Sequence, residues 1–172
     1  MQLHQVLADL TTTANFYTTR VERIHTLEHE ALLQSFLLEH RPSPADLRIG
    51  LHGTFPALAL DIVANGFDRA RELRPGLGLG VPFTIDVRHA VRDSDRTRQP
   101  DEPREIIVAA VVCGESASAE AGWMDFGVTA RGTPILTRWS EDGCDFVVGK
   151  AAQAMPLYRV TGLTGLKKLC EV

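Results

Sequence analysis

The run EIIVAAVVCG at residues 105–114 constrains the fold of this chain more than any other segment. It is rich in β-branched residues and apolar at successive positions, so both faces of an extended strand would be apolar. The run is far shorter than the roughly 18 residues that a membrane-spanning helix needs. We therefore predict a central strand with few exposed side chains, which the rest of the chain covers on both faces.

The length and composition are those of a globular domain that is large enough to bury both faces of this strand. The chain has 172 residues, of which 44% are hydrophobic and 23% charged, and these values argue against disorder, collagen and coiled coil. A formal net charge of −4 provides no global positive field for phosphates, so nucleic acid is not expected as a partner. The first ten residues lack the pattern of a signal peptide. We expect an intracellular protein, cytoplasmic or nuclear, without membrane association.

Simple metal and redox motifs are weak in this sequence. Cys113, Cys144 and Cys170 are widely spaced, which predicts buried or half-buried thiols in a reducing compartment. His25 and His29 are four residues apart and could share a helix face, but no third ligand is evident, so we expect no metal site. The glycine-rich residues 76–80 are followed by Val-Pro-Phe and not by a helix, which argues against a Rossmann phosphate loop.

Apolar periodicity, prolines and glycines together predict an α+β domain. Helices are expected at residues 27–38, ending near Arg41 before two prolines, and at residues 56–66, starting with Pro56 and stopping at Gly66. A short helix is expected at residues 86–93, followed by a charged loop at 93–105. Residues 74–84 read as a loop that becomes extended. Strands are expected at residues 48–54, 105–114, 134–139, 145–149 and 158–163.

Several segments, in order, resemble the catalytic domain of the poly(ADP-ribose) polymerase family, especially its mono-ADP-ribosylating members. They are His52-Gly53-Thr54, the helix ending in Gly66-Phe67, the glycine-rich stretch leading into Phe83, the opening TTRVERIHTLEHEALLQSF and the closing CDFVVGKAAQAMPLYRV. The similarity spans about residues 16–160. It implies one ADP-ribosyltransferase-like domain over residues 1–172, with a core at about 16–163. The implied fold is a split antiparallel β-sandwich with flanking helices and NAD in the cleft between the sheets.

The resemblance also implies roles for individual residues. His52 would bond a ribose hydroxyl of NAD, and Gly53 would let its backbone approach the nicotinamide amide. Thr54, Phe83 and His89 would line the same NAD site.

Asp145 stands where polymerising members carry glutamate, and its charge would stabilise an oxocarbenium-like transition state. Its shorter side chain favours single transfer over chain elongation. A solvent-facing aspartate at a strand start is the simpler alternative. Glu141 or Asp142 would be the working carboxylate if the register is shifted.

Departures from the family pattern leave two functions open. Pro82 replaces the motif tyrosine, Ala90 replaces a serine that bonds nicotinamide, and His89 or Arg92 lies near the place of a second tyrosine. His89 could supply a replacement stacking surface, and Phe83 could turn inward.

A basic cluster lies near the expected pyrophosphate path, or on a solvated loop: Arg69, Arg71 and Arg74.

The first function is NAD-dependent transfer of one ADP-ribose unit to a protein or other macromolecule. The alternative is a catalytically degenerate module that binds a ligand or a protein.

Overall fold

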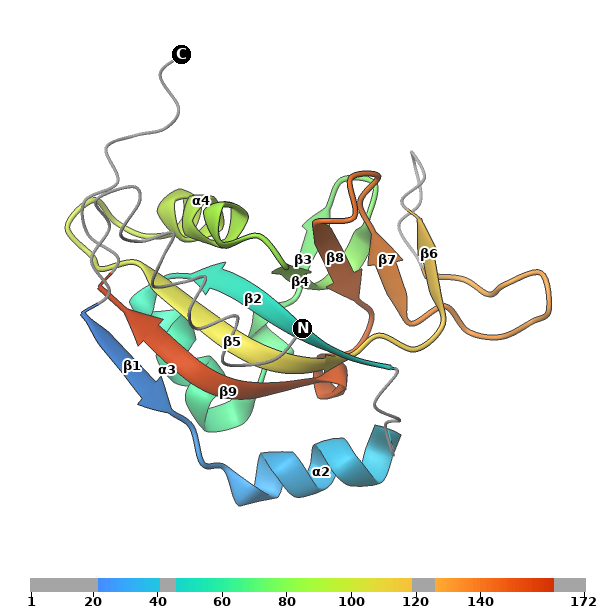
Figure 1. Ribbon diagram of the computed structural model, residues 1–172, viewed down its shortest axis with the longest axis horizontal. Coiled ribbons are helices and arrows are strands. Elements are labelled where there is room, and N and C mark those ends of the chain that lie inside the picture. Colours follow the sequence, from blue (N-terminus) through green and yellow to red (C-terminus); the bar gives the residue numbers. More distant parts are fainter. Residues whose placement is uncertain (1–21, 41–45, 119–125, 163–172) are drawn as a thin grey trace, which may run out of the picture.

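The computed structural model describes residues 22–40, 46–118 and 126–162, which form a mixed α+β fold (Figure 1). The strands are β1 (Arg23–Thr26), β2 (Leu47–Thr54), β3 (Glu72–Arg74), β4 (Gly78–Thr84), β5 (Glu105–Val112), β6 (Ser116–Ser118), β7 (Thr137–Trp139), β8 (Asp145–Val148) and β9 (Ala154–Thr161). The helices are α2 (Glu30–His40), α3 (Pro56–Asn65) and α4 (Val87–Thr97), with 3-10 turns η1 (Asp68–Ala70) and η2 (Ala151–Gln153).

The strands form one large, mostly antiparallel sheet. Within the described residues its order is β1-β9-β5-β2-β4-β8-β7-β6, and β3 pairs with β4. The pairing of β6 with β7 is parallel, and the other pairings are antiparallel. This confirms the α+β prediction and its antiparallel character.

β5 is the central strand that the sequence predicts. It pairs with β2 along its whole length and with β9 on its other side. Ile106 and Val108 pack with the buried side of α4. Ile107 and Ala109 pack into the opposite core, with side chains of α3. All four side chains are completely buried, so the expected burial of both faces is confirmed.

The sheet divides between β2 and β4. These strands share a single register pair, Leu51 opposite Thr84, whereas β2 and β5 are paired at every position of β2. The group β1-β9-β5-β2 therefore meets the group β4-β8-β7-β6 at one point (Figure 1). C-terminal to Leu51, the edge of β2 that faces away from β5 pairs with no strand among the described residues. That stretch carries His52, Gly53 and Thr54.

α3 has the boundaries that its sequence predicts. Pro56 occupies the first turn, where its missing N–H removes no helical hydrogen bond. Gly66 ends the helix at a φ of 82°, a conformation that glycine adopts without steric cost, and its N–H donates to the carbonyl of Ile62.

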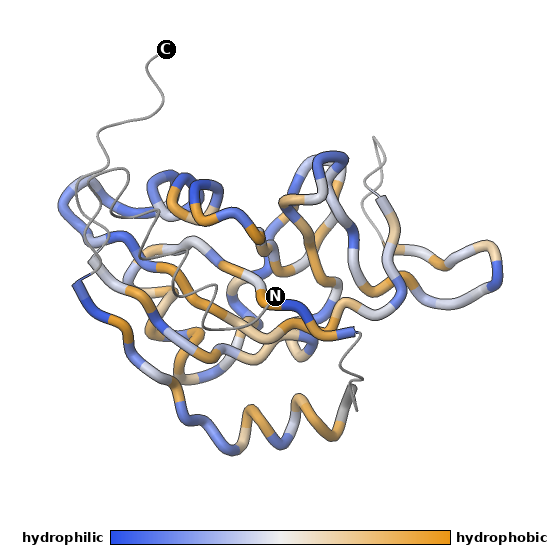
Figure 2. The backbone as a smooth tube through the Cα atoms, in the orientation of Figure 1, coloured by the Kyte–Doolittle hydropathy of each residue, from blue (hydrophilic) through white to orange (hydrophobic). Residues whose placement is uncertain are grey.

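α4 is longer than predicted, because it continues to Thr97 into the expected charged loop. The Asp86 carboxylate caps it by accepting a hydrogen bond from the Arg88 N–H. Its buried residues recur at helical spacing, and its charged residues lie on the other side, as the mixed colours of α4 in Figure 2 show. The buried residues are Val87, Ala90, Val91 and Ser94. Charge density alone therefore misplaced the end of this helix.

The first helix begins later than predicted, and the two nearby histidines do not share a helix face. His25 lies in β1, and His29 precedes α2. The ring of His29 instead accepts a hydrogen bond from the N–H of Leu32 and lies 3.1 Å from the carbonyl oxygen of Ala64. No group of three metal-ligating side chains occurs in the described ranges.

The remaining predictions differ mainly in their boundaries. Residues 72–84 form the β3–β4 hairpin, in which Gly76 takes a φ of 77°. β4 begins within the glycine-rich stretch, where a Rossmann loop would lead into a helix. The three late strands are present as β7, β8 and β9, with β9 starting at Ala154, earlier than expected. Cys113 is buried and Cys144 half-buried, both unbridged, and Cys170 lies outside the described residues. Burial raises the pKa of the Cys113 thiol to about 11.

Candidate functional site

His52 lies where β2 and β4 separate, and its imidazole bridges the two strands. Nδ1 is 2.9 Å from the carbonyl oxygen of Pro82. Because a carbonyl oxygen only accepts hydrogen bonds, Nδ1 carries the proton and Nε2 carries a lone pair. Phe67 and Phe83 hold the ring, with centroids 5.7 and 5.9 Å from that of His52. Burial lowers the pKa of His52, so the imidazole is neutral at pH 7.

Two polar atoms of this segment are buried without a hydrogen-bond partner among the described residues: His52 Nε2 and Thr54 Oγ1. Residues two apart on a strand share a face, so both side chains belong to the inner face of β2. The residues are only 6% and 1% exposed. Buried polar atoms are nearly always paired with protein, water or ligand. A hydroxyl group that donates to Nε2 has the chemistry that this position requires.

Gly53 faces the other way, against α4. A Cβ at this position would lie 1.8 Å from the carbonyl oxygen of Ala90 and 2.8 Å from the backbone nitrogen of Ser94. The sequence predicted that the missing side chain permits a close approach. The close approach in this structure is made by the α4 backbone, so only glycine fits here.

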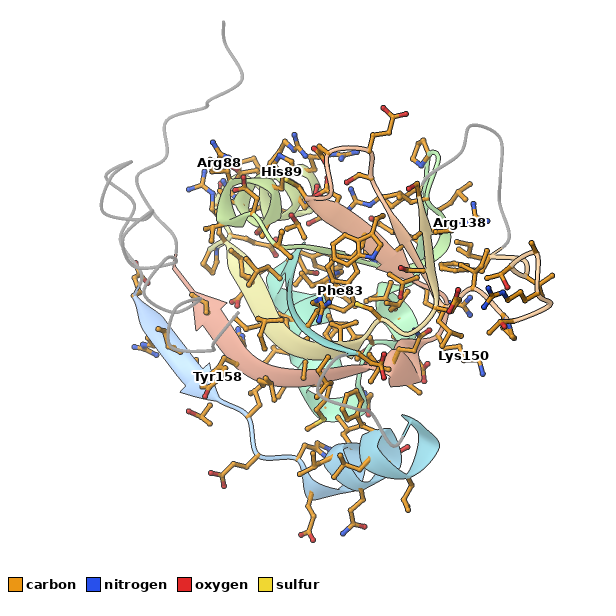
Figure 3. The ribbon with its side chains drawn as sticks, turned by 45° about the vertical axis from the view of Figure 1, so that its right-hand side comes forward. Phe83, Arg88, His89, Arg138, Lys150 and Tyr158 are labelled. Carbon is orange, nitrogen blue, oxygen red and sulfur yellow. The ribbon has the colours of Figure 1, made fainter. Side chains whose placement is uncertain are left out.

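Phe83 belongs to the core. It is 3% exposed and lies edge-on to Phe67 at a centroid distance of 5.2 Å. Phe146 stacks on it at 5.6 Å, and Trp139 stacks on Phe146 at 4.4 Å. Figure 3 shows Phe83 inside the fold. The ring packs in the core and forms one wall around His52, and its expected contact with NAD stays a prediction.

Asp145 begins β8, directly opposite Thr84 of β4. Its side chain is 32% exposed, and Oδ1 lies 2.9 Å from His89 Nδ1. Its second oxygen lies 4.0 Å from Arg92 Nη2. His89 is therefore a hydrogen-bond partner of the predicted catalytic carboxylate, a role that the sequence did not assign to it.

The three candidate carboxylates have different surroundings. Asp142 accepts hydrogen bonds from the hydroxyl of Ser140 and the N–H of Cys144, at 2.6 and 2.9 Å. These bonds hold the pKa of Asp142 below its usual value and fix it as a turn-stabilising residue. Glu141 is exposed in the same turn. Of the three acids, Asp145 is the one that contacts α4, through His89 and Arg92.

The structure brings the predicted segments together at the split. His52 contacts Phe83, Phe83 is in register with Phe146, and Asp145 precedes Phe146. Alternation along β8 places Asp145 on the face opposite Phe146, toward α4, whereas His52 lies with Phe83 on the inner face. The two candidate catalytic groups thus lie on opposite sides of the junction between the strand groups.

Ser94 contributes to the structure of the candidate site, although the sequence analysis did not single it out. Its hydroxyl donates to the carbonyl of Thr54 at 2.7 Å and accepts from the N–H of Glu105 at 3.1 Å. Thr54 and Glu105 are a register pair, so the serine bridges the β2–β5 ladder where it opens. The signal that could have identified Ser94 is its position: it lies at helical spacing from the apolar residues of α4, on the side of this charged helix that is buried.

The predicted basic cluster is engaged with acidic residues. Arg74 pairs with Glu72 and donates two hydrogen bonds to Asp93 at 2.9 and 3.3 Å. Arg69 lies 3.8 Å from Asp61, with its side chain 78% exposed. These ion pairs favour the interpretation of a solvated loop over a preformed anion site.

Comparison of the sequence with protein-family models and with curated proteins finds no match. The described helices include none that is both long and apolar enough to cross a membrane.

Proposed function

We propose that this chain is an ADP-ribosyltransferase-like domain that binds NAD at the split between β2 and β4. It transfers a single ADP-ribose unit to a macromolecular acceptor. The observation that carries the proposal is the buried, unpartnered lone pair of His52 Nε2 beside the unpaired edge of β2. A neutral imidazole with Nδ1–H fixed on Pro82 is oriented to accept a hydrogen bond from a ribose hydroxyl.

Further support comes from the way the strands meet. The single register pair that joins the two strand groups supports the split sandwich that the family resemblance implies. Gly53 lies in the stretch of β2 that has no register partner in β4, and Asp145 starts β8, the strand that pairs with β4. In this arrangement His52 and Thr54 hold NAD from the inner face of β2, next to the backbone of Gly53. Asp145 acts from the α4 side of the same junction, so the nicotinamide ribose passes between β2 and β4 to reach the carboxylate, which stabilises the positive charge that develops on it.

Burial sets a condition on binding. Because His52 Nε2 and Thr54 Oγ1 are enclosed, a ligand reaches them only when β4 or the side chains around His52 shift. β2 and β4 share only one register pair, the fewest of any strand pair among the described residues, since the ladder along β2 is made with β5.

The second candidate function is a non-catalytic ligand-binding or protein-interaction module. The close packing of Ala90 against Gly53 favours it, because Ala90 also replaces the serine that the family uses to bond nicotinamide. Pro82, which replaces the motif tyrosine, is engaged through its carbonyl with His52. In this role the site would bind a ligand without cleaving it.

Two measurements on the full chain test the proposal. NAD should raise the melting temperature, because a ligand that binds only the folded state must stabilise it. Incubation with labelled NAD should then give a discrete mono-modified product. A ladder of polymer would contradict single transfer. Binding without any label would favour the non-catalytic module, and no stabilisation by NAD would overturn both the NAD site and the transferase.

A further inference from the structure

The contact between His89 and Asp145 joins two elements that are distant in the sequence. His89 lies in the first turn of α4, and Asp145 begins β8. Because Asp145 Oδ1 is a hydrogen-bond acceptor in the ionised carboxylate, the 2.9 Å contact assigns a proton to His89 Nδ1. In the neutral ring, Nε2 then carries the lone pair. A carboxylate that fixes the tautomer of an imidazole in this way prepares its other nitrogen to accept a proton.

The ring is partly exposed. The side chain of His89 is 24% exposed, in contrast to the enclosed His52. Figure 3 shows it beside Arg88 on α4, at the outer surface of the fold. The charged or titratable groups around it are Asp86, Arg88, Arg92, Asp142, Cys144 and Asp145. Arg88 pairs with Asp86, and Arg92 lies 4.0 Å from Asp145.

We infer that His89 is the general base of the reaction, oriented by Asp145, and that the acceptor is a hydroxyl group. This inference rests on the proposed function. A carboxylate acceptor is already ionised at neutral pH and needs no base, whereas a hydroxyl must lose its proton as it attacks. A carboxylate–imidazole dyad on the α4 side of the β2–β4 junction therefore matches a hydroxyl-bearing acceptor that approaches from that side.

The transfer step balances with these groups. The acceptor oxygen forms a bond to the anomeric carbon of the nicotinamide ribose, and its proton passes to His89 Nε2. The bond from that carbon to the nicotinamide nitrogen breaks, and its electron pair stays on nicotinamide, which leaves as a neutral molecule. Asp145 stabilises the imidazolium that forms, and the exposed ring returns its proton to solvent.

The decisive variant is His89→Asn. The asparagine amide can still donate to Asp145, but it has no basic nitrogen. His25→Asn, at an exposed position of β1, is the matched control. The probes are NAD with water, and NAD with methanol as a simple alcohol acceptor, both measured as NAD cleavage. His89→Asn should keep the NAD-dependent rise in melting temperature and slow cleavage by about 100-fold or more. It should also remove the limb of the pH–rate profile that requires a neutral base, while His25→Asn changes neither.

A second measurement does not depend on activity. Nitrogen-15 NMR of the histidine rings should show the neutral His89 ring protonated at Nδ1, and Asp145→Asn should weaken this tautomer preference. A ring protonated at Nε2 overturns the dyad, as does His89→Asn cleavage at the wild-type rate. If the wild type cleaves NAD and modifies a macromolecular acceptor, but hydroxylamine releases the ADP-ribose as it does from esters, the inference that the acceptor group is a hydroxyl is contradicted. If the wild type neither binds nor cleaves NAD, the proposed function fails with it.

Discussion

Two neighbouring polar clusters on the same face of the sheet differ in how their hydrogen bonds are completed. Glu105, which is completely buried, accepts two hydrogen bonds from Arg159, at 2.7 and 3.0 Å, and a third from Thr161 at 3.2 Å. Thr54 is directly opposite Glu105 in the ladder, yet its Oγ1 has no partner among the described residues, and neither has Nε2 of His52.

The difference separates a structural polar group from a functional one. A completed set of hydrogen bonds stabilises the fold, and its removal costs folding free energy. A buried polar atom without a partner costs about 1–3 kcal/mol of folding free energy, and it retains its full capacity for a ligand. We therefore expect substitutions in the β5–β9 cluster to change stability, and substitutions on the inner face of β2 to change ligand binding.

The largest effect on stability is expected for Glu105→Ala. It removes the carboxylate from Arg159, and breaking a buried pair costs about 3–5 kcal/mol. Because the Arg159 side chain is 19% exposed, we expect the lower end, about 3 kcal/mol, in the free energy of unfolding by urea. Glu30→Ala on the exposed surface of α2 is the control and should change stability by less than about 0.5 kcal/mol. Equal losses for both variants would remove the contrast between the clusters.

The next effect concerns the opposite face of β2. Gly53→Ala places a Cβ against the backbone of Ala90, which cannot rotate away, and overpacking of this kind costs about 1–3 kcal/mol. Gly149→Ala is the matched control, because its Cβ would meet Phe126 at an ordinary 3.4 Å. Thermal unfolding of the two variants measures the difference. A tolerated Gly53→Ala would mean that α4 does not lie tightly on this strand.

The sequence could predict the parts of the fold that depend on local pattern. Apolarity on both faces identified β5, and Pro56 with Gly66 identified the ends of α3. A charge-rich sequence such as residues 93–105 is compatible with a helix and with a loop. The end of α4 was therefore not predictable without knowing which side of the helix is buried. The pairing of His89 with Asp145 spans 56 residues and depends on the phase of α4 and the register of β8 together. Neither can be read from the residues alone.

The smallest effect is a pH dependence of stability from His52. Burial holds its folded-state pKa below 6.5, so the unfolded chain binds a proton that the folded chain does not. Stability is therefore complete above pH 6.5 and falls as the pH drops toward the folded pKa, by at most about 1.4 kcal/mol per pH unit. His52→Phe, which keeps an aromatic ring beside Phe67 and Phe83, should lose this slope between pH 7 and 5. Urea unfolding at each pH tests this, and identical slopes for the two proteins would contradict a buried neutral histidine.

Calorimetric titration of NAD into the wild type, His52→Ala and Asp145→Asn tests the central claim most directly. The unpartnered Nε2 should bond the ligand, so His52→Ala should weaken NAD binding by about 1–3 kcal/mol. Asp145→Asn should bind NAD almost as the wild type does and cleave it more slowly, because a fixed charge acts chiefly where positive charge develops in the transition state. Equal NAD affinity in the wild type and His52→Ala, or no NAD binding by the wild type, would contradict the account.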